Sequence, residues 1–469
     1  MPTPPYNYVN LGTARQQLAN RLYDSAQVFW SPAELNLYIA EALRTWNSLT
    51  SYWKSDFTFQ GQQGLQWLDM TDFTVMPNST RLPQLKDTDL YLQMQYHLLE
   101  PPVGVNPWPG VSTQFSADDL VSAVSRRRDE TLSVTGCTYT RRLTPAVAGR
   151  IVLPDTVIDV RRLAYLQFTP RPYGSGNYGS GPYGVGTAQI GQIVWQEDTW
   201  AEEAFNRSYI VQPPGTPQTF LMSTEPPLAF EAYPPPMPGH YYELLTIEGG
   251  PAMAANMPQP LNIPDDWSYV IKWGALADLL SRESNAKDPT RAQYCEQRYR
   301  MGLQILTTAP ALLSMRLTNL GQSLQVDSVR EADLFNTGWE AAPQGPPQEI
   351  LAAGLNLIAV SPAPDAGLYS FTATVVCNAP VPVLDTDPVQ LARDDYDAVI
   401  DYAQHLATFK MGGAELMSTV PLFQRFLKQA SLYGLKLTEM GEFTTYLLGI
   451  SAGEEQVNPR LSVPQTEGQ

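Results

Sequence analysis

Residue types that commonly carry catalysis or bind metals are scarce and scattered in this chain. They are three histidines and three cysteines: His97, His240, His405, Cys137, Cys295 and Cys377. A catalytic triad or a metal site needs such residues in a recognisable spacing, and these six show none. The glycines at 174–186 also lack the Lys-Ser/Thr ending of a phosphate-binding loop. We therefore expect no enzymatic activity, no catalytic residue, no metal and no cofactor, and interpret the cysteines as buried thiols.

Positive charge is concentrated in one segment of an otherwise acidic chain. With 30 Lys and Arg against 47 Asp and Glu, the net charge is −17, which argues against a protein that grips nucleic acid through its phosphates. Residues 121–171 nevertheless hold nine arginines, no lysine and four acidic residues. This segment is either a solvated basic face or a surface that docks an acidic protein or DNA. The candidate docking residues are Arg126, Arg127, Arg128, Arg141 and Arg142.

A second candidate for docking is the segment "RPYGSGNYGSGPYGVG", residues 171–186, in which Tyr-Gly recurs at 173, 178 and 183. Six glycines in so short a run do not sustain a packed element, so the pattern predicts a long loop or arm. It is either an exposed hairpin tip or an arm that orders against a neighbouring subunit. Tyrosine suits the second role because it brings a large contact area at low entropic cost. The candidate residues are Tyr173, Tyr178 and Tyr183.

The N-terminal half contains two copies of a helix-start signal. In "WSPAELNLYIAEALRTW", residues 30–46, Ser31 and Glu34 form a capping-box pattern before an apolar stripe at helical spacing. The order aromatic, Ser, two residues, acid, Leu returns in "FSADDL" at Phe115. We expect helices at 11–22 and 32–49, a β segment in "DFTFQGQQGLQWLDM", a proline-marked linker at 101–109, and further β structure in "RIVLPDTVIDVRRLAYLQF".

A longer repeat lies in the C-terminal half. "LAFEAYPPPMPGHYYELLTI" from residue 228 aligns with "LNLIAVSPAPDAGLYSFTATV" from residue 355, and "PDDWSYVIKWGALADLL" from 264 aligns with "RDDYDAVIDYAQHLATF" from 393. Each copy is interpreted as a β-hairpin with a proline-rich turn, a helix that starts on paired aspartates, and a second antiparallel helix. The aspartates are expected to interact with the helix dipole and to cap free amides. The matched residues are Asp265, Trp267 and Trp273 with Asp394, Tyr396 and Tyr402.

These elements predict an α+β fold, with a helical N-terminal region and β segments followed by two repeated hairpin-plus-helix-pair units. No apolar run approaches the roughly 20 residues that span a bilayer, so we expect a soluble protein without membrane contact. The expected domains are 1–100, N-terminal helices and a β segment; 101–219, the second capping-signal unit with the arginine-rich region and the Tyr-Gly arm; 220–310, the first repeat; 311–440, the second repeat; and 441–469, a C-terminal tail.

In their order along the chain, these motifs resemble the head-to-tail adaptor (connector) proteins of tailed bacteriophages. The resemblance rests on "WSPAELNLYIAEALRTW", "FTFQGQQGLQWLDM", "LAFEAYPPPMPGHYYELLTI" and "PDDWSYVIKWGALADLLSRES…YCEQRY", and covers about two thirds of the chain. It implies a structural virion protein in the phage neck, made in the host bacterial cytoplasm. It also implies a ring beneath the portal that joins the capsid to the tail and continues the DNA channel.

The implied partners are further copies of the chain, the portal protein and a tail or nozzle protein, with transient, non-specific passage of genomic DNA. Twelve-fold ring symmetry is expected, with six-fold symmetry as the alternative that a duplicated chain allows. The order of units, with two N-terminal signals followed by two C-terminal repeats, departs from the single unit typical of the family. The alternative functions are another neck, collar or tail structural protein, or a peripheral receptor-binding or decoration protein.

Overall fold

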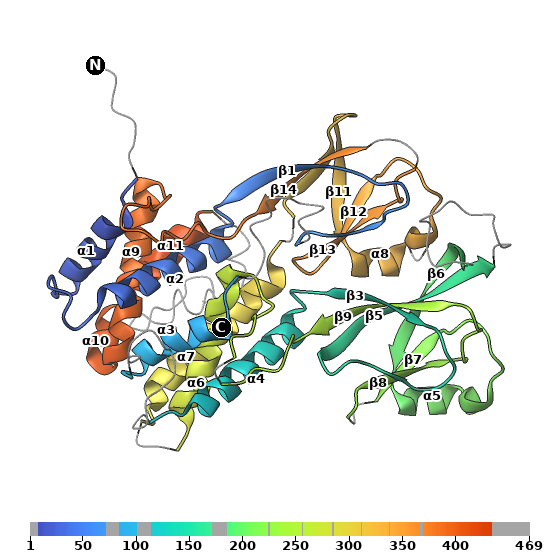
Figure 1. The fold of residues 1–469 in the computed structure, drawn as a ribbon, viewed down its shortest axis with the longest axis horizontal. Coiled ribbons are helices and arrows are strands. Elements are labelled where there is room, and N and C mark those ends of the chain that lie inside the picture. The colour runs from blue at the N-terminus through green and yellow to red at the C-terminus, as the bar shows by residue number, and fades with distance from the viewer. Residues whose placement is uncertain are drawn as a thin grey trace, which may run out of the picture. The chain divides into compact units, whose positions relative to one another are not determined.

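The computed structural model describes residues 8–71, 84–100, 114–170, 185–223, 226–255, 257–283, 286–310, 312–336, 338–365 and 369–433. The predicted arm residues Tyr173, Tyr178 and Tyr183 lie outside these ranges. The chain forms two compact units, one of residues 1–42 with 382–469 and one of residues 43–381. In Figure 1 the larger unit contains every β-strand of the described chain.

The described residues of the larger unit form two seven-stranded sheets. In order across the first sheet, the strands are β1 (Lys54–Gln60), β14 (Ser370–Val376), β10 (Ser314–Leu317), β11 (Gln322–Ser328), β12 (Glu349–Ala353), β13 (Leu357–Ser361) and β2 (Trp67–Asp69). The second sheet runs β3 (Thr140–Pro145), β9 (Tyr241–Glu248), β5 (Val157–Pro170), β6 (Val185–Glu197), β7 (Thr219–Ser223), β8 (Ala229–Tyr233) and β4 (Ile151–Val152). Strands that hold the same position in the two sheets also occur in the same order along the chain.

The two sheets share the same connections as well as the same strand order. Each has one parallel pair, β11 with β12 and β6 with β7, and its other pairs are antiparallel. A short helix and a 3₁₀ turn join the strands of each parallel pair. These are α8 (Val329–Phe335) and η3 (Trp339–Ala341) in the first sheet, and α5 (Thr199–Phe205) and η1 (Tyr209–Val211) in the second. Such agreement indicates an internal duplication.

Strand pairing shows that one copy is nested inside the other. β1 and β2 pair with β14 and β13, from the far end of the chain, whereas β3 and β4 pair with β9 and β8. We call residues 86–308 the inner copy, and residues 10–70 with 312–431 the outer copy. Matching isolated bridges, Asn10 with Pro388 and Lys86 with Pro260, extend the correspondence to the first helix of each copy. This nesting accounts for the order of two N-terminal signals followed by two C-terminal repeats.

The helices of the copies also correspond. Within the larger unit the inner copy has α3 (Asp87–His97), α4 (Ala117–Thr135), η2 (Asp265–Trp267), α6 (Ser268–Ser281) and α7 (Pro289–Thr308). The outer copy has α1 (Leu11–Arg21), α2 (Pro32–Thr50), α9 (Arg393–Thr408), η4 (Phe409–Met411), α10 (Gly413–Ser418) and α11 (Val420–Ser431), and the boundary between the compact units falls inside α2.

The predicted mixed α+β class is confirmed, and each repeat does end in a helix pair. The predicted hairpins are wrong, because β8 and β9 are separated in the sheet by three strands, as are β13 and β14. Proline lacks the N–H group that a ladder needs, and each proline-rich segment crosses the sheet instead of turning tightly. Its carbonyls accept hydrogen bonds from Gly215 and Gly345, at 2.8 and 3.0 Å.

Aromatic and small side chains hold each helix pair together. Trp273 of α6 and Tyr402 of α9, predicted to be equivalent, are both fully buried against the second helix of their pair. Tyr402 stacks on Phe426 at 4.4 Å, and Trp273 meets Tyr294 edge-on at 5.7 Å. In α7, a Cβ on Gly302 would lie 2.6 Å from Val270 of α6, so this glycine allows the two helices to approach closely.

The paired aspartates lie at helix starts as predicted, but their side chains do not cap those helices. The Asp266 carboxylate accepts hydrogen bonds from the Asn47 side chain at 2.5 Å and from the Ala379 amide at 3.0 Å. Asp265 accepts from the amides of Gln84 and Leu85. Asp265 and Asp266 therefore bind segments far away in the sequence. Burial raises the pKa of Asp266 to about 7, despite the lowering effect of these hydrogen bonds.

This pKa predicts a pH dependence of stability. Between about pH 4 and pH 7, folded Asp266 keeps a proton that the unfolded chain releases, so the free energy of unfolding should fall as pH rises, by up to about 1.4 kcal/mol per pH unit. Asp266→Asn should remove this part of the slope, measured by urea unfolding across the range. The control Asp394→Asn, at the exposed start of α9, should keep it. An unchanged slope in Asp266→Asn would contradict the assignment.

Candidate functional site

The two copies contact each other through a turn of the outer copy and an extended segment of the inner copy, both in the unit of residues 43–381. The Leu355 amide donates to the Cys137 carbonyl at 2.6 Å. The Asn356 side chain accepts from the Tyr139 amide and donates to its carbonyl, both at 2.9 Å. Gly354 has a φ of +61°, and a Cβ there would lie 2.7 Å from the Cys137 carbonyl oxygen. The turn therefore needs glycine both for its conformation and for the close approach.

Arg162 is the centre of the contact. This side chain comes from β5 of the inner copy and is only 5% exposed. Its guanidinium donates to Asp333 of α8 at 2.7 and 3.2 Å, and one nitrogen lies 3.0 Å from a carboxylate oxygen of Glu340 in η3. It also donates to Glu243 of its own copy at 3.1 Å. Arg162 thus joins carboxylates from both copies in a buried cluster.

The electrostatics of this cluster depend on the pairing. Burial by itself would lower the pKa of Arg162, but the negative charges of Glu340 and Asp333 raise it above its ordinary value, so the guanidinium stays charged. Burial raises the pKa of Glu340, and the facing Arg162 opposes that rise. A buried cation with several carboxylates is costly to break, because removing one partner leaves the others buried without compensation.

Two tryptophans of the outer copy surround the ionic cluster. Trp67 of β2 and Trp339 of η3 meet edge-on at 5.7 Å, and the Trp339 ring nitrogen donates to Asp333 at 2.9 Å. The Arg162 guanidinium lies 5.6 Å from the centre of the Trp339 ring, and that of Arg141 lies 5.8 Å from the centre of the Trp67 ring. Cations over aromatic faces are favourable, so the aromatic rings and the arginines reinforce the same contact.

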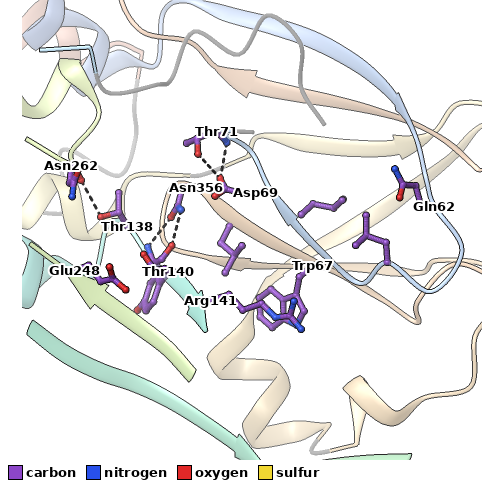
Figure 2. A pocket seen from close by; sticks show the side chains of 14 residues that line it. Gln62, Trp67, Asp69, Thr71, Thr138, Thr140, Arg141, Glu248, Asn262 and Asn356 are labelled. Atoms are coloured by element: carbon purple, nitrogen blue, oxygen red, sulfur yellow. Dashed lines mark hydrogen bonds between the residues drawn. The ribbon is translucent and has the colours of Figure 1, made fainter. Parts of the chain in front are cut away.

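A pocket of about 670 Å³ opens beside this contact (Figure 2). Its lining comes from both copies and includes Asp69, Thr71, Arg141, Glu248 and Asn356. Many of its polar groups bind neighbouring protein groups: the Thr71 amide and hydroxyl donate to Asp69 at 2.8 and 2.7 Å, as Figure 2 shows. The pocket walls also include groups that join the copies, such as Asn356 and Tyr139.

Other potentially reactive groups also have structural partners. His405 is buried, with Nδ1 2.9 Å from the Thr419 hydroxyl, and His97 is buried with Nε2 3.1 Å from the Lys272 amine. Cys137 and Cys295 are buried thiols as interpreted from the sequence, and burial raises the pKa of Cys137 to about 11. Cys377 is half-buried. Among the residues that the structure describes, no group of three or more His, Cys, Asp or Glu side chains could hold a metal ion.

Each of the five candidate docking arginines forms an ion pair with a carboxylate of the same chain. Arg127 is the most enclosed by carboxylates, pairing with Asp278, Glu296 and Glu130 while lying 4.6 Å over the Tyr299 ring. The others pair as follows: Arg126 with Asp278, Arg128 with Asp129, Arg141 with Glu243 and Arg142 with Glu248. Their docking of an external partner stays a prediction, since much of their charge is balanced within the chain.

The residues that matter most at the contact were not singled out from the sequence. Asp333, Trp339 and Glu340 lie within eight residues of one another, but Arg162 and Trp67 come from segments more than 90 residues apart and far from these three, and nothing local relates them. A partial signal was the charged "RR" pair inside the otherwise apolar strand pattern at 157–168, because an arginine in a buried strand requires a buried partner.

Comparisons with known proteins do not identify the chain: no family model matches it, and no curated protein matches its sequence. In the described part of the chain, no helix is both long enough and apolar enough to cross a membrane.

The Arg162 cluster predicts a large and specific loss of stability. Arg162→Ala should lower the free energy of unfolding by about 3–5 kcal/mol, because it leaves Asp333, Glu340 and Glu243 buried without their cation. Arg161→Ala is the matched control: Arg161 is the neighbouring strand residue, partly exposed and paired with Asp159. It should cost no more than about 1 kcal/mol in the same chemical denaturation experiment. Equal losses in the two variants would contradict the role given to Arg162.

Proposed function

We propose that this chain is a structural virion protein of a tailed bacteriophage, which assembles as a ring-shaped head-to-tail adaptor beneath the portal. The ring would join capsid to tail and continue the DNA channel. The sequence resemblance supports the family. The single observation that carries the assembly is the contact between the inner and outer copies, where one β-unit binds a second β-unit of the same topology.

That contact is heterologous, which is the property a ring requires. The inner copy contributes Arg141 of β3, Arg162 of β5 and Leu245 of β9, whereas the outer copy contributes α8, η3 and β12. Because the two copies use different faces, each chain retains one face of each kind for further contacts. A heterologous contact repeated with a suitable rotation closes into a ring, and without such a rotation it forms a filament.

The composition suits a channel through which DNA moves. The net charge of −17 gives the assembly a strongly negative field, and a wall of this sign does not hold the DNA phosphates through ion pairs. The arginines of 121–171 are extensively paired with carboxylates, which limits their use as a DNA-gripping surface. Portal and tail proteins would bind at the two faces of the ring, with the Tyr-Gly arm as a candidate contact.

Purified chain mixed with portal protein should form closed rings that join the portal. Negative-stain microscopy would show the ring, and native mass measurement would give an integral multiple of the 52.0 kDa chain. The chain without portal is the comparison, because the ring can depend on the portal for its formation. A chain that stays monomeric and never joins a portal would contradict the proposal.

A further inference from the structure

One surface is covered in the outer copy and uncovered in the inner copy. In the outer copy, Val329 of α8 and Trp339 of η3 are 5% and 1% exposed, packed in one cluster with Leu245 of the inner copy. Figure 1 shows α8 between the two sheets, whereas α5 lies beside β7 and β8, away from the outer-copy sheet. On α5 and η1 of the inner copy, Trp200 is 79% exposed and Val211 is 78% exposed.

We propose that this inner-copy surface binds the outer-copy sheet of a second copy of the chain. We define the α5 face as Arg150, Trp200, Glu203, Ile210 and Val211, and the β1 face as Asp56, Thr58, Ser314, Arg316 and Thr374. In the outer copy, the surface equivalent to the α5 face is covered by the inner copy of the same chain. In the inner copy, the surface equivalent to the β1 face provides this cover. The proposal names the contact between chains in the ring and rests on the proposed function.

Matching elements fix which residues correspond. The helices α5 and α8 have seven residues each, and the turns η1 and η3 have three each. Trp200 therefore stands where the outer copy has Arg330. Burial raises the pKa of Tyr139 in the inner copy, and the charge of Arg330 is among the weaker influences that oppose this rise. Ile210 stands where the outer copy has Glu340. The exposed apolar side chains of α5 and η1 in the inner copy thus occupy positions whose outer-copy equivalents, Arg330 and Glu340, interact with the inner copy.

Charge complementarity supports the pairing at a first pair of positions. Within the chain, Arg141 of β3 lies over the ring of Trp67 in β2. The core-facing residues Tyr242 and Leu244 of β9 correspond to Phe371 and Ala373 of β14, so Leu245 corresponds to Thr374 and not to Ala373 as in the sequence alignment. Asp56 pairs with Thr374 as Arg141 pairs with Leu245, which places Asp56 of β1 at the position of Arg141. The strand registers also place Arg150 at the position of Trp67, one residue before Ile151.

Ile151 pairs with Phe230 in the second sheet, and Leu68 pairs with Ile358 at the corresponding place in the first sheet. Ile151 directly follows Arg150, as Leu68 directly follows Trp67. The cation–aromatic contact within the chain would therefore become an Asp56–Arg150 ion pair between chains. Both residues are exposed, and their present hydrogen bonds, Asp56 with Thr374 and Arg150 with Ser223 and Pro227, leave room for a further ion pair.

A second pair of positions changes in a matched way. The strand registers place Ser314 of β10 at the position of Arg162. Arg162 and Glu340, which form one ion pair of the buried cluster, thus both have uncharged counterparts, Ser314 and Ile210. The third member of the cluster, Asp333, has an acidic counterpart, Glu203. The β1 face carries one cation, Arg316, two residues from Ser314 on the same strand.

The occupant is a second copy of the chain because each chain presents one α5 face and one β1 face. An exposed patch with Trp200, Ile210 and Val211 is typical of a protein–protein contact. The β1 face offers a threonine-rich strand surface, with Thr58 and Thr374 beside Asp56. Two chains that meet through these faces leave one face of each kind uncovered at the ends, so the contact continues until the ring closes.

Charge reversal tests the contact in the full-length chain. Asp56→Arg and Arg150→Asp should each weaken association about tenfold or more, because each places like charges opposite one another. The double variant restores opposite charges and should recover most of the loss. Sedimentation over a range of protein concentrations, with portal present as the nucleating partner, gives the half-assembly concentration. Arg300→Asp, an exposed arginine of α7, is the matched control and should assemble normally.

Cross-linking gives a readout that does not depend on the strength of the ion pair. Chains carrying Asp56→Cys, mixed with chains carrying Arg150→Cys, should give mixed dimers with a short bismaleimide, and neither chain alone should do so above the natural-chain background. Normal rings with both single reversals, and no mixed cross-link, would overturn the proposed contact while leaving the ring function standing. Failure of the natural chain to form any ring would contradict the proposed function and this contact together.

Discussion

The Arg162 guanidinium, shared between carboxylates of two copies of one fold, is the interaction on which the larger unit depends. It lies on an inner-copy strand and binds Asp333 and Glu340 of the outer copy. A buried cation tolerates little misplacement, because each missing hydrogen bond leaves a charge without compensation. The cluster therefore selects one relative arrangement of the two sheets. The backbone contact at Gly354 and the edge-on contact of Trp67 with Trp339 stabilise the same arrangement.

Nesting gives this contact a second advantage. The inner copy is joined to the outer copy at both of its ends, so the two faces meet at a high effective concentration without a separate association step. The cost is topological: β1 must pair with β14, and the whole inner copy lies between them in the sequence. Pairings so distant in sequence slow folding because the entropy of loop closure opposes them before their contacts form.

Local elements were predictable from the sequence because their signals are local. The helix at 32–50 follows from its apolar spacing, the capping box at Ser116 and Asp119 is present, and the strand at 157–170 follows from its alternation. Strand partners were not predictable, since the register between Lys54 and Val376 leaves no mark on either segment alone. For the same reason the sequence pattern predicts hairpins at the proline-rich segments, although β8 and β9, like β13 and β14, are not neighbours in the sheet.

The candidate site shows the same limit. Arg162 belonged to a visible arginine-rich segment, but its importance comes from Asp333 and Glu340, which only the fold brings near. Asp266 was noticed as a helix-start residue, and its actual partners, Asn47 and Ala379, lie in other elements. Sequence reasoning identified that units repeat. The order of nesting required the strand pairing.

The most direct test of the account is a cryo-electron microscopy reconstruction of the assembled ring. If inner and outer copies occupy equivalent positions, the contact between chains should superpose on the contact within a chain, and the β layer should contain twice as many repeats as there are chains. A ring in which only one copy forms the circle, with the other copy outside it and no α5 face against a neighbouring β1 face, would contradict the account.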